Sequence, residues 1–193
     1  MPTILPLETS RQLLEYVESY EDGVMVPYFG LALFAGIRTG TNGELWKLLH
    51  SDPKEIAAWI DLVNGEIRIQ PHISKTREYR RIKIQPNLAA WLTRYPVGNW
   101  PQNFDRHVKH IRAKFELGQD VLRHTFISEH VAAFSSIGQA ALQAGNTEAV
   151  TRRYYLNLTD SANAAGFWAI KPSKTEKKPN ALADDNAINH EAA

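Results

Sequence analysis

The stretch MVPYFGLALFAGI, residues 25–37, constrains the fold most strongly, because nearly every side chain in it is apolar. It is long enough for a helix, and a helix that is apolar on all sides must be covered by the rest of the chain. With 193 residues, the chain is large enough for one domain with a real core and too short for a second. The stretch therefore predicts a buried helix in a single domain, with the charge of Arg38 emerging from its end.

A change of hydrophobic period further along the chain predicts a small sheet. The stretches GEIRIQ (65–70) and RRIKIQ (80–85) alternate apolar and polar residues, as half-buried strands do. Between them lies the polar, basic connection PHISKTREYR (71–80). We expect a hairpin that carries Lys75, Arg77, Arg80 and Arg81 on its loop or strand ends.

Most of the remaining sequence predicts helices. Their stretches are LETSRQLLEYVESY, ELWKLLH, NLAAWLTRY, NFDRHVKHIRAKF, VLRHTFISEHVAAF, GQAALQA and SANAAGFWAI. The expected fold class is mainly α with a small antiparallel β-sheet (α+β). Residues 173–193 contain charges of both signs and no aromatic residue, which predicts a disordered tail.

Composition excludes several classes of function. The net charge is +1, so any nucleic-acid-binding surface must come from local clustering of basic residues. The chain has no cysteine, which excludes disulfides, thiolate nucleophiles and cysteine-ligated zinc. The first residues lack a basic region followed by an apolar one, and no apolar run approaches the length of a membrane span. We therefore expect a cytoplasmic protein.

Two arginines stand out because they lie in apolar surroundings. Arg38 follows the buried run, and Arg123 begins the apolar stretch VLRHTFI. Most arginines are solvated surface charges, but a charge in apolar surroundings is costly unless it is paired or meets an anion. Guanidinium groups bind two oxygens of a phosphate at once and stay protonated, and a tyrosine can act as a covalent nucleophile. These residue types together favour phosphodiester chemistry.

Four stretches in order resemble the tyrosine recombinases, or phage-type integrases, over roughly residues 5–170. FAGIR resembles the first arginine box of that family, and SKTREYRRIKI resembles the hairpin with the catalytic lysine. LRHTF resembles the second arginine box, and AGNTEAVTRRYY resembles the segment that ends in the nucleophile. The resemblance implies the catalytic-domain fold of this family for residues 1–172, with the family's N-terminal DNA-gripping (core-binding) domain absent from this chain.

The resemblance also implies a role for each matching residue. Arg38 and Arg123 would clamp the scissile phosphate, and Lys75 would protonate the departing 5′ oxygen. The family places its nucleophile nine positions after the residue that follows the box glycine, which is Asn146 here, so the nucleophile would be Tyr155. Tyr154 would then pack against Tyr155 or support it, as a core or interface aromatic. The implied reaction passes through a 3′-phosphotyrosine link and needs no cofactor, neither metal nor nucleotide.

Two positions depart from the common pattern of the family. Asp120 replaces a histidine, and we expect it either to accept a proton from Tyr155 or to orient Arg123 or Lys75. Asn146 replaces a histidine or tryptophan, and its amide can donate a hydrogen bond to a phosphate oxygen but cannot carry a proton.

Two further residues are expected to support the site. Glu44 is the candidate for the family's buttressing acid, and His124, directly after Arg123, is expected to have a supporting role.

The partners follow from the same resemblance. We expect double-stranded DNA to contact Arg77, Arg80, Arg152 and Arg153. The family implies a tetramer on DNA that exchanges a C-terminal segment, and we expect a monomer without DNA. The histidine pair in HVKH (107–110) has helical spacing but no third ligand, so a metal site is not expected.

Two alternatives remain open from the sequence. The chain could be a decayed or truncated integrase fragment that binds DNA without cleaving it, which Asp120, Asn146 and the absent N-terminal domain favour. It could also be a helical interaction protein, in which case Arg38, Lys75, Arg123 and Tyr155 would lie far apart.

Overall fold

A computed structural model describes residues 2–40, 43–98 and 100–173. The predicted disordered tail falls almost wholly outside these residues. The helices are α1 (Leu7–Ser19), a short 3₁₀ turn (Tyr20–Gly23), α2 (Val26–Phe34), α3 (Glu44–Leu49), α4 (Pro53–Trp59), α5 (Pro86–Arg94), α6 (Phe104–Lys114), α7 (Val121–Phe134), α8 (Ile137–Ala144), α9 (Glu148–Tyr155) and α10 (Ser161–Trp168). The strands are β1 (Ile60–Asp61), β2 (Glu66–Ile69) and β3 (Arg80–Lys83). The fold class expected from the sequence, mainly α with a small antiparallel sheet, is confirmed.

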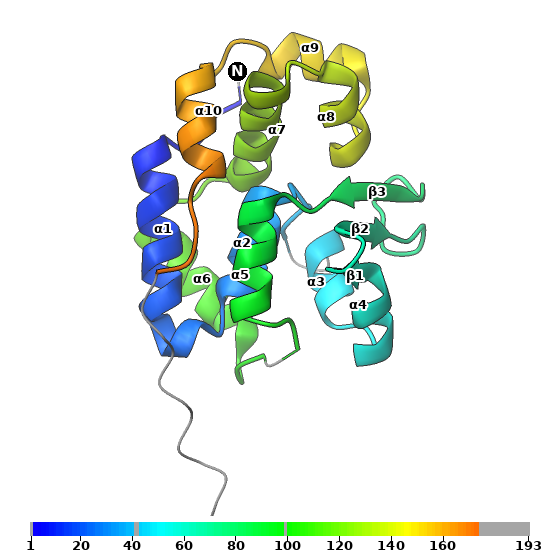
Figure 1. Cartoon of the computed structure of the whole chain (residues 1–193). Helices are drawn as coiled ribbons and strands as arrows, with labels where there is room; N and C mark the ends of the chain where they lie inside the picture. Colours follow the sequence, from blue (N-terminus) through cyan, green and yellow to red (C-terminus); the bar gives the residue numbers. More distant parts are fainter. Residues whose placement is uncertain (1, 41–42, 99, 174–193) are drawn as a thin grey trace, which may run out of the picture.

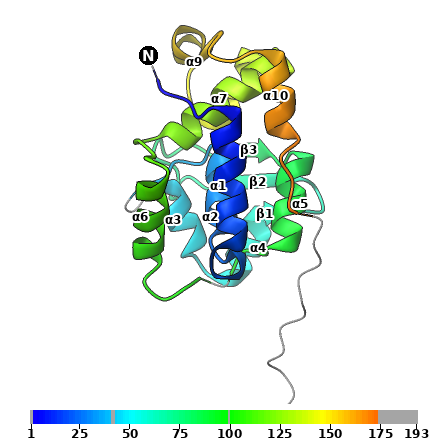
Figure 2. The same cartoon turned by 90° about the vertical axis from the view of Figure 1, so that its left-hand side faces the viewer.

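Helix α2 is the centre of the fold. Every one of its residues is buried, as the apolar run 25–37 predicts. Pro27 lies in its first turn, where a missing backbone N–H costs no hydrogen bond. Helices α1, α5 and α7 pack around it (Figures 1 and 2). The chain leaves α2 through Gly36, whose φ of 61° lies in the left-handed region, and Arg38 then emerges half-buried beside the core.

The sheet has the strand order β1-β2-β3, and all its pairs are antiparallel. The predicted hairpin is β2–β3, in which Ile67 faces Ile82 across the strands. Strand β1, only two residues long, was not predicted, because two residues carry no period. Lys75 and Arg77 lie in the ten-residue connection between β2 and β3, which places both side chains at the surface.

Helix α7 organises the other end of the molecule. Residues 121–123 and 125–131 of this helix are all buried, because α2, α8, α9 and α10 contact it from several sides (Figure 1). A second apolar cluster forms here from Phe126, Ile127, Val131, Ala140, Ala144 and Tyr155. Helix α8 also contacts β3, so one short helix joins the α7 end of the molecule to the sheet. Among the described residues, no helix is long and apolar enough to cross a membrane.

Gly36 should be the least replaceable glycine in the region. A Cβ added there would lie 2.3 Å from Cδ1 of Phe126, and its φ of +61° already strains any other residue. We expect Gly36→Ala to lower the free energy of unfolding by about 2–4 kcal/mol through left-handed strain plus displacement of the Phe126 ring. Urea unfolding measures the loss.

Gly65→Ala is the matched control for this substitution. Gly65 has a φ of +68° and nothing within 4 Å of an added Cβ, so it isolates the backbone strain, about 1–2 kcal/mol. Equal losses in the two variants would contradict the packing argument.

Candidate active site

The two arginines that the sequence singles out lie beside one another in space. Arg38 follows α2, and Arg123 lies in the first turn of α7. Arg123 is 5% exposed, and its guanidinium donates to the carbonyl of Gly36 at 2.7 Å. The Arg38 side chain is 17% exposed, so it is partly reachable from outside. Both guanidiniums point to the C-terminal end of α8, which lies between α7 and the sheet (Figure 1).

Three consecutive backbone carbonyls at that helix end each accept from a different guanidinium. Gln143 O accepts from Nε of Arg80 at 3.1 Å, Ala144 O accepts from Nη2 of Arg123, and Gly145 O accepts from Nη2 of Arg38 at 3.1 Å. The last carbonyls of a helix have no partner within the helix and carry its negative partial charge. The end of α8 therefore gathers three cations. We call Arg38, Arg80 and Arg123 the arginine cluster.

Glu44 is the carboxylate of this cluster, and it is 3% exposed. Its oxygens accept from Nη1 of Arg38 at 2.9 Å and from Nη1 and Nη2 of Arg80 at 3.1 and 2.5 Å. The backbone N–H of Lys75 donates to it at 2.9 Å. Burial opposes ionisation of this group, but the hydrogen bond and charge of Arg80, the Lys75 amide and Arg38 together hold its pKa at about 2. Glu44 is therefore ionised at neutral pH and joins the lysine-bearing connection to Arg38.

Arg80 differs from the sequence expectation. It was expected to bind DNA at the surface, yet the residue is 8% exposed and its guanidinium is occupied by Glu44 and Gln143. The alternation of β3 is the reason, because Arg80 points to the same face as Ile82, which is fully buried. This signal was present in the sequence, since Arg80 precedes Ile82 by two positions.

A groove of about 710 Å³ opens next to the cluster. It is lined by Arg38, Thr39, Gly43, Glu44, Lys47, Pro71, His72, Ile73, Ser74, Lys75, Arg77 and Asp120. Lys47, Lys75 and Arg77 are exposed and bring three cations to its walls. Arg152 and Arg153 are exposed on α9, outside the groove lining. The groove is thus a positively charged recess with the half-buried Arg38 in its wall.

Of the two residues that depart from the family pattern, Asn146 contacts the arginine cluster and Asp120 lines the groove beside it. Oδ1 of Asn146 accepts from Nη2 of Arg123 at 3.1 Å, so its amide NH₂ faces away from the guanidinium and remains able to donate. Asp120 precedes α7 with a left-handed φ of 56° and lines the groove. Within the part of the chain that the structure describes, its carboxylate makes no hydrogen bond or ion pair, so the expectation that it orients Arg123 or Lys75 has no contact to support it.

Tyr155 ends α9 and is 8% exposed, so its ring belongs to the apolar cluster of α7 and α8. Its ring centroid lies 5.7 Å from that of His124. Burial raises the pKa of the Tyr155 phenol, the positive charges of Arg123 and Arg38 lower it, and the negative charge of Asp120 raises it. Tyr155 is thus within electrostatic reach of the arginine cluster, and it is neutral at pH 7.

Two neighbouring side chains complete this picture. Burial lowers the pKa of His124, although the negative charge of Asp120 raises it. Tyr154, expected as a core or interface aromatic, is 39% exposed and lies under the guanidinium of Arg153, so it is not part of the core. The helical period separates it from Tyr155, because Tyr155 shares the buried side of α9 with Thr151, four residues earlier.

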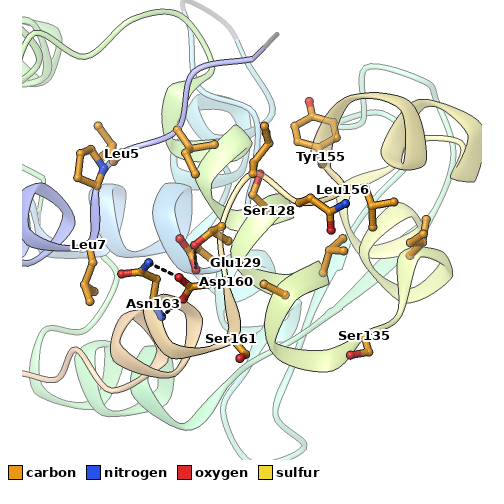
Figure 3. A pocket seen from close by; sticks show the side chains of 18 residues that line it. Leu5, Leu7, Ser128, Glu129, Ser135, Tyr155, Leu156, Asp160, Ser161 and Asn163 are labelled. Carbon is orange, nitrogen blue, oxygen red and sulfur yellow. Dashed lines mark hydrogen bonds between the residues drawn. The ribbon is translucent and has the colours of Figure 1, made fainter.

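A second cavity, of about 990 Å³, has Tyr155 in its lining (Figure 3). It is formed by the chain before α1, by α7 and by the segment that follows Tyr155. Glu129 lines it and is 2% exposed, and Oε2 of its carboxyl accepts from the Thr159 hydroxyl at 3.5 Å. Burial and the charge of Asp160 raise the pKa of Glu129 to about 7, although the bond from Thr159 lowers it. Sequence reasoning missed this carboxyl, because one acidic residue in an apolar helix carries no periodic signal.

The two histidines of α6, His107 and His110, each lie next to a tyrosine hydroxyl. Nδ1 of His107 lies 2.7 Å from the Tyr20 hydroxyl, and Nε2 of His110 lies 3.1 Å from the Tyr16 hydroxyl. Across residues 2–40, 43–98 and 100–173, no three His, Asp or Glu side chains are grouped so that they could hold a metal ion.

Comparisons with known proteins identify the fold. No protein-family model matches the chain, and no curated protein matches it significantly. Among solved structures, a crystal structure of XerA recombinase matches 90% of this chain with a TM-score of 0.59 and 19% identity. The Tn1549 transposon integrase, in complex with a circular intermediate DNA, matches 86% of this chain with a TM-score of 0.57 and 16% identity. The chain therefore has the fold of the tyrosine recombinase catalytic domain, as the sequence resemblance implies.

The chain spans 66% of the solved XerA recombinase chain and 65% of the solved integrase chain.

The buried Glu129 carboxyl should make stability depend on pH. Its pKa of about 7 lies above the ordinary value of 4.5, so the folded state binds more protons than the unfolded state between these values. The contribution of Glu129 to the free energy of unfolding is therefore fully present below pH 4.5, and it is lost as the pH rises towards 7. We expect Glu129→Gln to raise the free energy of unfolding at pH 8 by about 2 kcal/mol and to change it little at pH 4.5.

Urea unfolding at the two pH values checks this, with the exposed Glu15→Gln as the control. An equal effect of Glu129→Gln at both pH values would contradict the assignment.

Proposed function

We propose that this chain is a tyrosine recombinase catalytic domain that breaks and rejoins DNA through a phosphotyrosine intermediate. The observation that carries the proposal is the arginine cluster, in which Arg38 and Arg123 share one helix end, with Tyr155 within reach of their charges. The fold supports the same conclusion. An interaction protein would have no reason to bring buried cations, a basic groove and a buried phenol together.

The phosphate would bind at Arg38 and Arg123. Burial and the positive charges of Arg38 and Arg80 lower the pKa of Arg123 to about 9, although Glu44 and Tyr155 raise it. A lowered pKa means that the surroundings disfavour the cation, so an arriving anion would be stabilised there. The NH₂ group of Asn146 would donate to a further phosphate oxygen, which is the role that an amide can keep in place of a histidine or tryptophan.

The chemical step would use Tyr155 as the nucleophile. Its oxygen would form a bond to the phosphorus as the bond from phosphorus to the 5′ oxygen breaks. The leaving 5′ oxygen would take a proton from Lys75, whose side chain lies on the groove, and the phenol proton would pass to Asp120, a carboxylate without a partner in the described chain. Attack by another 5′ hydroxyl would reverse the step and release the tyrosine, so that no cofactor is consumed.

The proposed step needs a movement of Tyr155. Tyr155 packs in the apolar cluster and lines the second cavity, and it is not among the residues that line the groove. We propose that binding of DNA turns the end of α9, which brings the phenol towards Arg123. Gly145 to Thr147, between α8 and α9, is the short connection that would absorb the change.

The partner would be double-stranded DNA inside the cell. Exposed Arg77, at the groove, and Arg152 and Arg153, on α9, would contact further phosphates. Residues 1–172 would form the catalytic domain, as a monomer without DNA and as a tetramer on it. The solved integrase structure is a complex with a circular intermediate DNA, which supports the choice of partner.

A trapped cleavage reaction tests the proposal. The substrate is a duplex from the ends of the surrounding mobile element, nicked near the candidate site so that the cleaved strand end diffuses away. We expect the wild type to form a covalent protein–DNA band on a denaturing gel. In Tyr155→Phe, which lacks the nucleophile, adduct formation should fall on the order of 10³-fold or more.

Tyr154→Phe is the matched control, because Tyr154 is exposed on the same helix turn, and it should keep the adduct. An adduct that survives in Tyr155→Phe and vanishes in Tyr154→Phe would move the nucleophile by one residue. DNA binding without an adduct in any variant would favour the alternative, a fragment that binds DNA without cleaving it.

A further inference from the structure

Arg80 has no part in the proposed reaction, yet it is the most completely held guanidinium of the arginine cluster. Its side chain is 7% exposed. Two of its nitrogens bind the two oxygens of Glu44, Nε donates to Gln143 O at 3.1 Å, and Nη1 lies 3.5 Å from the Ser74 hydroxyl. A group buried in this way cannot contact a nucleic acid directly. Its effect on a ligand must pass through the residues that it holds.

The residue that Arg80 holds is Glu44, which is also the ion-pair partner of Arg38. One carboxylate is therefore shared between two guanidiniums. The shorter contact, 2.5 Å, goes to Arg80, and Arg38 contacts the same carboxylate through Nη1 at 2.9 Å. Together these three groups carry a net charge of about +1 rather than the neutral charge of a simple ion pair.

This sharing decides how strongly Arg38 can attract an anion. A carboxylate with Arg38 as its only cation would neutralise it and would repel an incoming phosphate. With Arg80 present, the charge of Glu44 is already balanced, and Arg38 keeps its positive charge for a ligand. Burial makes the effect larger, because charges in the interior are screened less than charges in water.

We infer that Arg80 is a positioning residue of the anion site, which balances Glu44 so that Arg38 remains available to a phosphate. This inference rests on the phosphate site of the proposed function, but it does not require strand cleavage. Arg80 also fixes the geometry of the site, since its bond to Gln143 O ties β3 to the same helix end that holds Arg38 and Arg123. Arg80 also packs closely against Gly145, because a Cβ added at Gly145 would lie 3.4 Å from Nε of Arg80.

Phosphate binding tests the inference without a DNA target. The full chain is titrated with inorganic phosphate, and the guanidinium N–H signals of Arg38 and Arg123 are followed by NMR. We expect Arg80→Gln to weaken phosphate binding about tenfold or more, because Glu44 then neutralises Arg38. Arg80→Lys keeps the charge, and we expect it to bind phosphate within about threefold of the wild type.

The double variant Glu44→Gln/Arg80→Gln separates charge balance from structural support. It removes one negative and one positive charge, so the site regains its net charge, and we expect phosphate binding to return to within about threefold of the wild type. Arg81→Gln is the matched control on the same strand, because the Arg81 side chain is 66% exposed and pairs with Glu66. It should leave phosphate binding unchanged.

Each outcome bears on the inference directly. Wild-type affinity in Arg80→Gln would overturn it, and so would a double variant as weak as Arg80→Gln, because Arg80 would then act only through structure. If Arg80→Gln does not fold, failure of Arg80→Lys to retain phosphate binding would overturn the charge argument. A wild type whose Arg38 and Arg123 signals do not respond to phosphate would also overturn it. A wild type that binds phosphate at these arginines but forms no adduct with DNA would contradict the cleavage proposal and leave this inference standing.

Discussion

The C-terminal end of α8 is the feature on which the site depends. An eight-residue helix leaves its last carbonyls without partners, and here three in a row accept from Arg80, Arg123 and Arg38. These arginines come from β3, α7 and the segment that follows α2, so one helix end fixes three distant parts of the chain. The helix dipole and Glu44 together hold cations that would otherwise repel one another. The arrangement leaves the cluster positive beside an open groove, which suits an anion that is bound and then released.

The sequence predicted those parts of this arrangement that follow from period and from the cost of burying charge. The apolar run 25–37 predicted α2, the alternation around Ile67 and Ile82 predicted the hairpin, and the apolar surroundings of Arg38 and Arg123 indicated that both needed partners. The identity of the partners could not be predicted. They are mostly backbone carbonyls, and any residue has a carbonyl, so only the position of α8 in space makes these the right ones. Strand β1 was also beyond prediction, because its pairing with β2 rather than its own two residues defines it.

The burial of Arg80 and the exposure of Tyr154 depend on a different signal. The family resemblance suggested that Arg80 contacts DNA, and Tyr154 was expected as a core or interface aromatic. The period of each element decides which side chain is buried. Arg80 follows the buried face of β3 with Ile82, and Tyr154 lies off the buried face of α9 that Thr151 and Tyr155 share. Local periodicity was the stronger signal at both positions.

Asn146 and Asp120, which depart from the family pattern, each keep a polar group available to a ligand. Asn146 holds Arg123 with its oxygen and keeps its NH₂ group for another acceptor, and Asp120 keeps an unpaired carboxylate at the groove, among the described residues, within range of the Tyr155 phenol. Tyr155 itself lies buried against His124 and lines a cavity. In the mechanism that we propose, the arginine cluster therefore binds the phosphate before Tyr155 moves to attack it.

A crystal structure of the Tyr155→Phe variant bound to duplex DNA would test that claim most directly. The expected result is one backbone phosphate that accepts from both Arg38 and Arg123 while these residues keep their bonds to the carbonyls of Gly145 and Ala144. A DNA backbone that crosses another face, or arginines that leave the end of α8 to reach a phosphate, would contradict it.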